Sequence, residues 1–409
     1  MKKILSFALI MILCVALFGC SAVPSLPSET AAPQDSAPAP SDDGAPAPAG
    51  NDAPDEDRLP EEAGTGQIII KIENSDIQYY YAPDGSGKLI LSYVCEKPIV
   101  EIENYGYASD TINNYFNDLD EEYYTGENRG RGNVFGPGFN QMLQKAYDNF
   151  QAAMDYEADL RLDLVFSHYV DILRCDNQVI SFVFTDYLYD GTSSSGEYYK
   201  YALCFDSFSG ELIDIKNNRE YSRIRKATNR TVAEYNELTY DLGTYYFDET
   251  GLSFILKNED GSYKTVTVPY DVYYNVEGSF MSITGKYLPG TVTVTDTAAD
   301  NSDLPILDRI DADSVGAQFF LTVEGTVYDF KLINVQYSNY EEMFYSKNVY
   351  WMTNYISDAR IKLQLDIPDG MPNMMLSYTS DGVEISRFIT QSGYDGTVML
   401  VDTDINAVG

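Results

Sequence analysis

The sequence predicts an α+β fold, in which an antiparallel sheet has helices packed on one face and a small all-β, sandwich-like domain follows. Three apolar-alternating runs follow one another between Leu160 and Asp214 with short turns between them, which is typical of an antiparallel meander. Two amphipathic segments precede the meander, as expected for helices that cover a sheet. A series of strand-like runs separated by turns fills the C-terminal part and favours a sandwich.

The N-terminus predicts an exported lipoprotein. Two lysines after Met1 precede an apolar run from Ile4 to Phe18, which is typical of a secretory signal and too short for a comfortable membrane span. The run ends in Leu17-Phe18-Gly19-Cys20, which resembles the bacterial lipobox, where the cysteine is acylated and becomes the mature N-terminus. We therefore expect a signal peptide over residues 1–19 and an extracytoplasmic protein anchored to the cell membrane by lipid on Cys20. An ordinary signal peptide with a chance cysteine is the alternative.

Residues 20–66 predict a disordered tether. The segment is acidic, rich in Pro and Ala and almost without large apolar side chains, so burial cannot offset the entropy lost on folding. The whole chain has 63 Asp and Glu against 27 Lys and Arg, a formal net charge of −36. This charge disfavours nucleic acid as a partner and favours a cationic one. The 35 tyrosines suit either exposed sheet faces or a wet contact surface.

Residues 67–290 predict the α+β module. The runs Ile68 to Ile70 and 88–94 indicate strands around a turn at 84–87, and Pro98 to Ile102 indicates a further extended piece. Two helices should follow, one capped by Ser109 or Asp110 and one over about Pro137 to Asp155. Each has one apolar face, so both should lie on the sheet. In the first helix this face consists of Ile112, Tyr115, Phe116, Leu119 and Tyr123.

The meander follows, with strands expected at Leu160 to Ile172, Ile180 to Leu188 and Tyr199 to Phe205, and a turn at Asp206 to Gly210. A third helix is expected over about 218–238. It carries one basic stripe, which indicates either a solvated face or a site for an anionic polymer, and which consists of Arg219, Arg223, Lys226 and Arg230. Short strands are then expected at 243–247, 252–256, 265–268 and 279–283.

Residues 291–305 predict a linker and residues 306–409 a β-sandwich-like domain. Strands of this domain are expected at 317–323, 327–337, 349–355, 361–367, 374–378, 383–389 and 397–401. Several acids lie close together near the linker and could hold Ca²⁺, namely Asp300, Asp303, Asp308, Asp311 and Asp313. They lack EF-hand spacing, so a solvated linker is favoured, and neither a metal nor a cofactor is expected.

Several short motifs are shared with a known family. They are Tyr93 with Pro98-Ile99-Val100-Glu101-Ile102 and Ile112-Asn113, Ser181 to Tyr187, Asp206 with Ser209-Gly210-Glu211, Tyr245 to Leu252, and Val268 to Val272 with Gly278. From about Lys88 to Leu288 their order resembles the extracytoplasmic domain of PdaC-like peptidoglycan deacetylases followed by the domain of RsiV-like anti-sigma factors. The resemblance implies an extracytoplasmic α+β module and, in the RsiV-like branch, sensing of lysozyme by binding it.

The shared motifs are structural, and one loop departs from the family. Members commonly have a Gly-Gly-Ala-His type loop between the second and third meander strands, whereas residues 190–196 here contain no histidine. No role of that histidine is therefore carried over. The sequence also has no match to the deacetylase catalytic part.

The residue types give catalysis little support. His168, the only histidine, falls on the apolar face of the first meander strand, which favours a core role. A single histidine excludes multi-histidine metal sites and disfavours a Ser-His-Asp triad. The thiols of Cys95, Cys175 and Cys204 lack metal-site spacing and leave disulfide pairing open. Carboxylate pairs are numerous, so a carboxylate-dependent hydrolase of cell-wall glycan is the alternative function.

The loop between the second and third meander strands is the predicted ligand site. It should place six polar residues at one end of the sheet, namely Asp186, Tyr187, Tyr189, Asp190, Glu197 and Tyr198. Tyrosine beside Asp or Glu suits a basic protein surface or a sugar, while an ordinary solvated hairpin is the competing interpretation. The leading hypothesis is a non-catalytic cell-surface lipoprotein that binds an extracellular protein, such as a lysozyme-like protein, or a cell-wall glycan.

Overall fold

A computed structural model describes residues 66–126, 138–156, 163–191, 196–215, 244–248, 250–258, 260–270, 288–298, 302–311, 316–338, 343–367, 372–392 and 395–403. The chain divides into two units, residues 1–62 and 63–409, and every described residue belongs to the second. Several predicted features lie outside the described residues: the signal peptide, the tether up to residue 65, the helix expected over 218–238 and the strand expected at 279–283.

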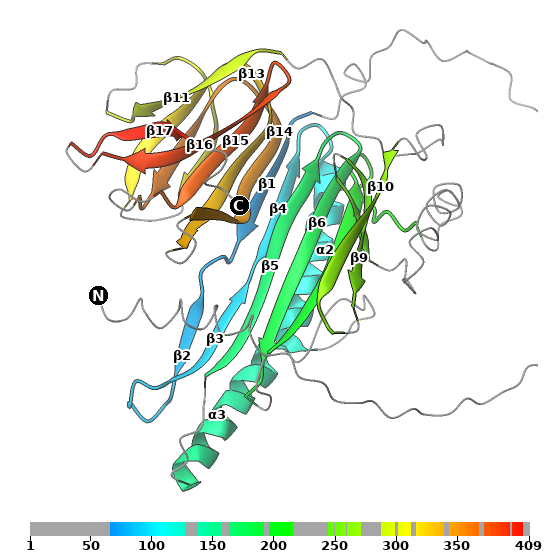
Figure 1. Ribbon diagram of the computed structural model, residues 1–409, viewed down its shortest axis with the longest axis vertical. Helices are drawn as coiled ribbons and strands as arrows, with labels where there is room; N and C mark the ends of the chain where they lie inside the picture. The colour runs from blue at the N-terminus through cyan, green and yellow to red at the C-terminus, as the bar shows by residue number, and fades with distance from the viewer. Residues whose placement is uncertain are drawn as a thin grey trace, which may run out of the picture. The chain divides into compact units, whose positions relative to one another are not determined.

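Within the described residues, the strands form three sheets (Figure 1). The meander sheet consists, in spatial order, of β2 (Gln78–Tyr81), β3 (Leu89–Cys95), β5 (Leu164–Cys175), β6 (Val179–Tyr189) and β7 (Glu197–Asp206). The C-terminal sheet has the order β17 (Val398–Asp402), β16 (Val383–Gln391), β15 (Met374–Ser380), β13 (Ala317–Ser338), β14 (Met343–Leu365), β1 (Ile68–Glu73) and β4 (Lys97–Ile102). It also includes β11 (Gly290–Asp296) beside β13 and β12 (Ile306–Asp311) beside β14. The small sheet has the order β10 (Tyr263–Pro269), β9 (Gly251–Lys257) and β8 (Tyr245–Phe247).

The central strands of the meander sheet form where the sequence alternates most regularly. In β5 the even-numbered side chains from Leu164 to Ile172 are buried, while Val165, Tyr169 and Asp171 on the other face are only partly buried. β6 and β7 continue in antiparallel register, with Phe184 opposite Val170 on one side and Tyr201 on the other. The predicted meander is therefore confirmed for the described residues.

The turn after β7 ties the meander to the first helix. Oδ1 of Asp206 accepts hydrogen bonds from the backbone N–H groups of Phe208 at 3.0 Å and Ser209 at 2.8 Å. Gly210 has a φ of +73°, and a Cβ at this position would clash with the carbonyl oxygen of Ala108. Glycine is required here both for the backbone conformation and for the close approach.

The two described helices, α2 (Gly106–Thr125) and α3 (Phe139–Tyr156), cover one face of the meander sheet, as predicted. Their buried side chains pack with those of β5, β6 and β7 in one hydrophobic core and include Ile112, Phe116, Leu119, Tyr123, Met142, Ala146 and Phe150. Neither Ser109 nor Asp110 caps α2, because both lie inside the helix. Oγ of Ser109 instead accepts the backbone N–H of Ile102 at 2.8 Å, so the residue joins α2 to the end of β4.

One strand pair in the meander sheet is parallel rather than antiparallel. β3 pairs with β5 in parallel, with Tyr93 opposite Phe166. Both helices lie between these strands in the sequence. Parallel strands need a long crossover connection of this kind, because a tight hairpin joins only antiparallel strands. The helices that cover the sheet therefore also determine its topology.

The chain passes between the meander sheet and the C-terminal sheet at two neighbouring points. Residues 74–77 connect β1 to β2, and Glu96 alone separates β3 from β4. The carboxylate of Glu96 accepts the backbone N–H of Val170 in β5 at 2.8 Å and the side-chain amide of Asn348 in β14 at 3.0 Å. The prediction that Ile68–Ile70 and the 88–94 run form a hairpin around the turn at 84–87 is wrong. The strand that pairs with β3 across this turn is β2, whereas β1 pairs with β4 and β14.

The C-terminal sheet is built on the long hairpin of β13 and β14, each of which joins two of the expected strands. The first half of β13 pairs with β11 and the second half with β15, with a register shift between Val323 and Thr326. Both halves contribute to one hydrophobic cluster that includes Phe319, Phe330, Trp351, Ile361 and Ile389. The expected linker at 291–305 is corrected in part, because most of β11 lies within it.

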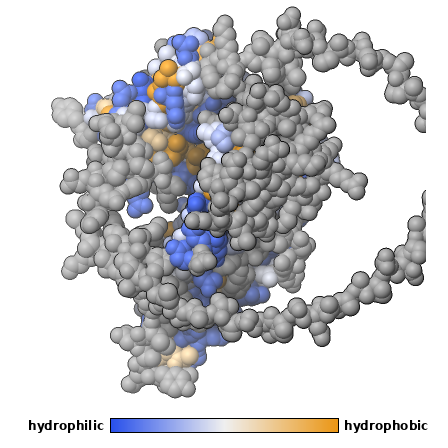
Figure 2. Space-filling model, turned by 45° about the vertical axis from the view of Figure 1, so that its right-hand side comes forward, coloured by the Kyte–Doolittle hydropathy of each residue, from blue (hydrophilic) through white to orange (hydrophobic). Residues whose placement is uncertain are grey.

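The small sheet has its own core. β8, β9 and β10 form next to β6 and β7, and their buried side chains pack with Val179 and Cys204. The hydroxyl of Tyr245 accepts the backbone N–H of Ile215 at 2.8 Å and donates to the carbonyl of Ile213. No helix in the described part of the chain is long and apolar enough to cross a membrane. The described surface on the face in Figure 2 is mainly hydrophilic.

Candidate functional site

The structure brings most of the predicted ligand residues together at one end of the meander sheet. Tyr187 pairs with Tyr198 across β6 and β7, and their ring centroids lie 4.7 Å apart. Glu197 and Tyr198 are exposed, and Tyr187, Tyr189 and Asp190 are partly buried. These five residues belong to a hairpin end, and their role in binding stays a prediction. None of them lines the cleft or the wider groove described below.

Asp190 is not a free acid in this hairpin. Its Oδ2 lies 2.5 Å from Nζ of Lys145 on α3, and both side chains are partly exposed. The pair joins the hairpin to the end of the helix layer. A ligand that needs the Asp190 carboxylate would have to compete with this lysine.

The placement of Asp186 corrects the prediction. Asp186 lies in β6 and is fully buried, with Oδ1 2.5 Å from Nδ1 of His168 and Oδ2 accepting a 2.6 Å hydrogen bond from the Tyr123 hydroxyl. The Tyr123 hydroxyl is also 3.1 Å from that of Tyr201. Burial raises the pKa of both tyrosines well above the usual value, so they remain neutral donors. Asp186 is therefore a core residue and not a ligand contact, and His168 has the core position expected of it.

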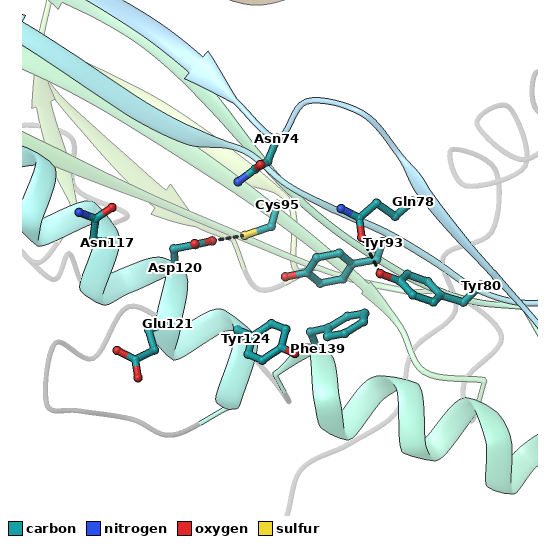
Figure 3. A pocket seen from close by; sticks show the side chains of 10 residues that line it. All are labelled: Asn74, Gln78, Tyr80, Tyr93, Cys95, Asn117, Asp120, Glu121, Tyr124 and Phe139. Carbon is teal, nitrogen blue, oxygen red and sulfur yellow. Dashed lines mark hydrogen bonds between the residues drawn. The ribbon is translucent and has the colours of Figure 1, made fainter.

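A cleft on the helix side of the meander sheet is the strongest candidate site. It has a volume of about 370 Å³, within the range of roughly 300–1,000 Å³ that is typical of small-ligand pockets. Its lining comes from the β1–β2 connection, β2, β3, α2 and α3 (Figure 3). The lining residues are Asn74, Gln78, Tyr80, Tyr93, Cys95, Asn117, Asp120, Glu121, Tyr124 and Phe139.

Four aromatic rings form one wall of the cleft. Phe139 lies at their centre, with ring centroids 5.2 Å from Tyr80, 4.7 Å from Tyr93 and 5.4 Å from Tyr124. Tyr124 stacks on Phe139 and is 52% exposed, so part of the ring remains open to a ligand. Packing against Phe139 holds the tyrosine rings in place, which lowers the entropy lost when a ligand binds.

Asp120 lies at the opposite side of the cleft. Figure 3 shows its carboxylate pointing toward Cys95, and the Cys95 sulfur is 4.0 Å from Oδ1. This weak contact is the one hydrogen bond that Asp120 makes to the described residues. Burial raises the pKa of Asp120, partly offset by Lys97 and His168. A half-buried carboxylate with so few donors is suited to accept hydrogen bonds from a ligand.

Amide side chains complete the cleft. Oε1 of Gln78 accepts the Tyr80 hydroxyl at 2.5 Å, which leaves the Gln78 amide nitrogen as a donor. Asn117 accepts from Nζ of Lys97 at 3.3 Å on the helix side. Asn74 has a φ of +60°, a left-handed conformation that asparagine tolerates better than most residues. This conformation ends β1 and turns the chain toward β2.

A second, wider groove shares Asn74 and Gln78 with the cleft. Its volume is about 900 Å³, and it extends to the ends of β13 and β14. Its described lining holds no lysine, arginine or histidine, but includes five acids, Glu73, Asp76, Glu96, Asp311 and Asp366. Glu96 accepts hydrogen bonds from both sheets, and Glu73 pairs with Nζ of Lys97 at 3.6 Å, so Asp76, Asp311 and Asp366 are the acids that a cationic ligand would meet in this groove.

Metal and thiol chemistry have no assembled site among the residues that the structure describes. No group of three or more His, Cys, Asp or Glu there could hold a metal ion. Cys95, Cys175 and Cys204 are buried free thiols, and burial raises the pKa of each. Asp308, one of the acids near the expected linker, instead pairs with Lys71 at 3.0 Å and accepts from Nε1 of Trp351 at 2.8 Å.

Comparison with known proteins found partial likenesses to two solved structures of bacterial proteins. No protein-family model matches the sequence, and no curated protein does. A solved DUF3298 family member from Bacteroides fragilis is 12% identical, with a TM-score of 0.38, and the match covers 52% of this chain and 94% of that one. A DUF3298 family protein from Pseudomonas aeruginosa is 5% identical, with a TM-score of 0.33, covering 54% and 98%. Both likenesses are partial, and neither says what this protein binds.

Sequence reasoning missed the cleft, although one signal was present. Asn117, Asp120, Glu121 and Tyr124 have the spacing i, i+3, i+4 and i+7, which places them along one side of α2. A polar stripe of this kind is usually a solvated helix face, so the spacing alone does not indicate a site. The strand residues opposite come from two other elements and share no motif with it.

Proposed function

We propose that the protein is a non-catalytic binding protein of the cell surface, held at the membrane by lipid on Cys20. Its ligand is a cell-wall glycan or a cationic extracellular protein, such as a lysozyme-like protein. The observation that carries the proposal is the cleft beside α2, which combines a rigid aromatic wall with amides and carboxylates. Such a lining binds and orients a polar ligand but supplies no activated nucleophile.

A cationic protein is supported by the second groove and by the overall charge. Burial raises the pKa of Tyr350, and the charges of Asp76 and Asp311, which line the same groove, raise it further. A basic segment would find several carboxylates and no competing cation among the described lining residues. Attraction of this kind should weaken as salt rises, because the Debye length is about 10 Å at 0.1 M.

Hydrolysis of a wall glycan is the second candidate function. Asp120 has the raised pKa that a general acid needs, and Glu121 lies beside it in the same cleft. Consecutive helix residues point about 100° apart, and in Figure 3 Asp120 points toward Cys95 while Glu121 points away. A glycosidase needs two carboxyl groups on either side of one bond. This geometry favours binding over hydrolysis.

Calorimetric titration of the full-length protein tests the proposal. We expect binding of soluble peptidoglycan fragments, or of lysozyme with an affinity that falls between low and physiological salt. For lysozyme, Asp76→Asn with Asp311→Asn should weaken binding more than the matched pair Asp190→Asn with Glu197→Gln, which removes charge from the hairpin. Absence of binding to both probes at low salt would overturn the proposal.

A further inference from the structure

We infer that the cleft beside α2 is a saccharide site, which takes a pyranose unit that carries no anionic group. The inference rests on the proposed function and decides which class of ligand this cleft receives. It does not concern the wider acidic groove, which has a different lining.

The hydrogen-bonding groups of the cleft match a polyhydroxylated ligand. Six of the lining side chains can both donate and accept, namely the amides of Asn74, Gln78 and Asn117 and the hydroxyls of Tyr80, Tyr93 and Tyr124. Burial raises the pKa of Tyr80 and Tyr93, so these hydroxyls keep their protons and remain donors. A simple ammonium ion would use only acceptors and leave the donors without partners. A sugar hydroxyl donates and accepts at once, so it can satisfy neighbouring groups of both kinds.

The aromatic wall supplies a flat apolar surface next to these polar groups. Tyr124 is the most exposed of the four rings and is held from one side by stacking on Phe139. A pyranose ring has an apolar C–H face and a polar edge, so it can pack on Tyr124 while its hydroxyls reach the amides and Asp120. Both contacts are available within one cleft of about 370 Å³.

The charges in the cleft select against anionic sugars. Asp120 and Glu121 are the charged side chains among the described lining residues, and both are acids. The Asp120 carboxylate is half-buried and has the thiol of Cys95 as its one described hydrogen-bond partner, at 4.0 Å. A ligand hydroxyl can donate to this carboxylate, whereas a uronate or phosphate group beside it would be repelled.

The test is a titration of the full-length protein with size-matched oligosaccharides. The neutral probe is the β-1,4-linked tetramer of N-acetylglucosamine, and the anionic probe is tetragalacturonate. Trimethyl-lysine serves as a cation without hydroxyl groups. We expect the neutral tetramer to bind at least about tenfold more tightly than either other probe, a difference of roughly 1.4 kcal/mol.

Two tyrosine variants locate the site. Tyr124→Ala should weaken binding of the neutral tetramer at least about tenfold, because it removes the exposed ring. The matched control is Tyr107→Ala on the same helix, where the side chain is 76% exposed and does not line the cleft, and it should leave the affinity unchanged. Thermal melting of both variants checks that each remains folded.

The outcomes separate this inference from the proposed function. Binding of peptidoglycan fragments or lysozyme without binding of the neutral tetramer would overturn the saccharide site and leave the proposed function standing. An equal affinity for tetragalacturonate or trimethyl-lysine, or a loss of affinity in Tyr107→Ala as large as that in Tyr124→Ala, would also overturn it. Failure of every probe would overturn both.

Discussion

Nδ1 of His168 lies 2.5 Å from Oδ1 of Asp186, and the two side chains are only 2% and 0% exposed. Tyr123 brings α2 into the same network through its hydrogen bond to Oδ2 of Asp186. The network therefore joins β5, β6 and the helix layer inside the core of the meander sheet. Removing one member of such a buried network leaves a polar partner without its hydrogen bond, which lowers the stability of the fold.

Asp186→Asn should lower the free energy of unfolding by about 3 kcal/mol, because an amide offers one acceptor oxygen where the two oxygens of Asp186 contact His168 and Tyr123 in the core. Asp190→Asn, in the same hairpin, is the matched control and should cost no more than about 1 kcal/mol, because its pair with Lys145 is partly exposed. Denaturant unfolding measures both. His168→Gln should likewise lower stability and leave ligand affinity unchanged. Equal effects of the two aspartate changes would contradict the core assignment.

Stability should depend on pH through Asp171. Burial on the outer face of β5 raises its pKa from 3.8 to about 6, against the opposing effect of Lys200. A pKa that is higher in the folded state means that the folded protein binds the proton more tightly, so this contribution to stability is present below about pH 4 and is lost as the pH rises through about 6.

Asp171→Asn should therefore stabilise the protein at pH 7 by up to about 3 kcal/mol, since each pKa unit corresponds to about 1.4 kcal/mol. It should have little effect at pH 4, where the aspartate is protonated in the folded protein. Unfolding of wild type and variant at both pH values measures the difference. A variant that is equally stabilised or destabilised at both values would show that Asp171 is not the titrating group.

Alternation predicted the meander because β5 and β6 each bury one face and the period of two is visible over the whole strand. The same alternation predicts that Asp186 points into the core, because it lies on the same face of β6 as Phe182 and Phe184. The prediction of Asp186 as a loop residue did not take this alternation into account. His168 was placed correctly by that parity. In both strands the order of neighbouring residues was sufficient to predict which side chains are buried.

Other features depended on contacts between distant segments. The sequence Ile68 to Ile70 is compatible with any sheet, and its pairing with β14 is decided by tertiary packing rather than by local pattern. Ser109 is a residue type that often caps helices, yet it lies inside α2, where its hydroxyl oxygen accepts a hydrogen bond from the N–H of Ile102. The cleft combines residues from α2 with residues from β2, β3 and α3, so no single stretch indicates it.

Membrane anchoring is a separate prediction that rests on Cys20. Cys20→Ala should release the protein into the soluble fraction or leave the signal peptide uncleaved, because acylation of this thiol is the expected anchor. Fractionation of cells that express wild type or variant, followed by mass measurement of the N-terminus, tests it. Normal processing with unchanged membrane association would contradict the lipoprotein assignment.

The most direct test of the central claim is incubation of the purified full-length protein with insoluble peptidoglycan, measuring sedimentation of the protein and release of reducing ends in the same sample. A separate sample without peptidoglycan, in which the protein is passed over immobilised lysozyme, covers the case of a protein ligand. We expect the protein to sediment with peptidoglycan or to be retained by lysozyme. Tyr124→Ala should reduce sedimentation while Tyr107→Ala does not, and no reducing ends should appear in the peptidoglycan sample. Release of reducing ends that is lost in Asp120→Asn would contradict it, because the cleft would then be a hydrolase site.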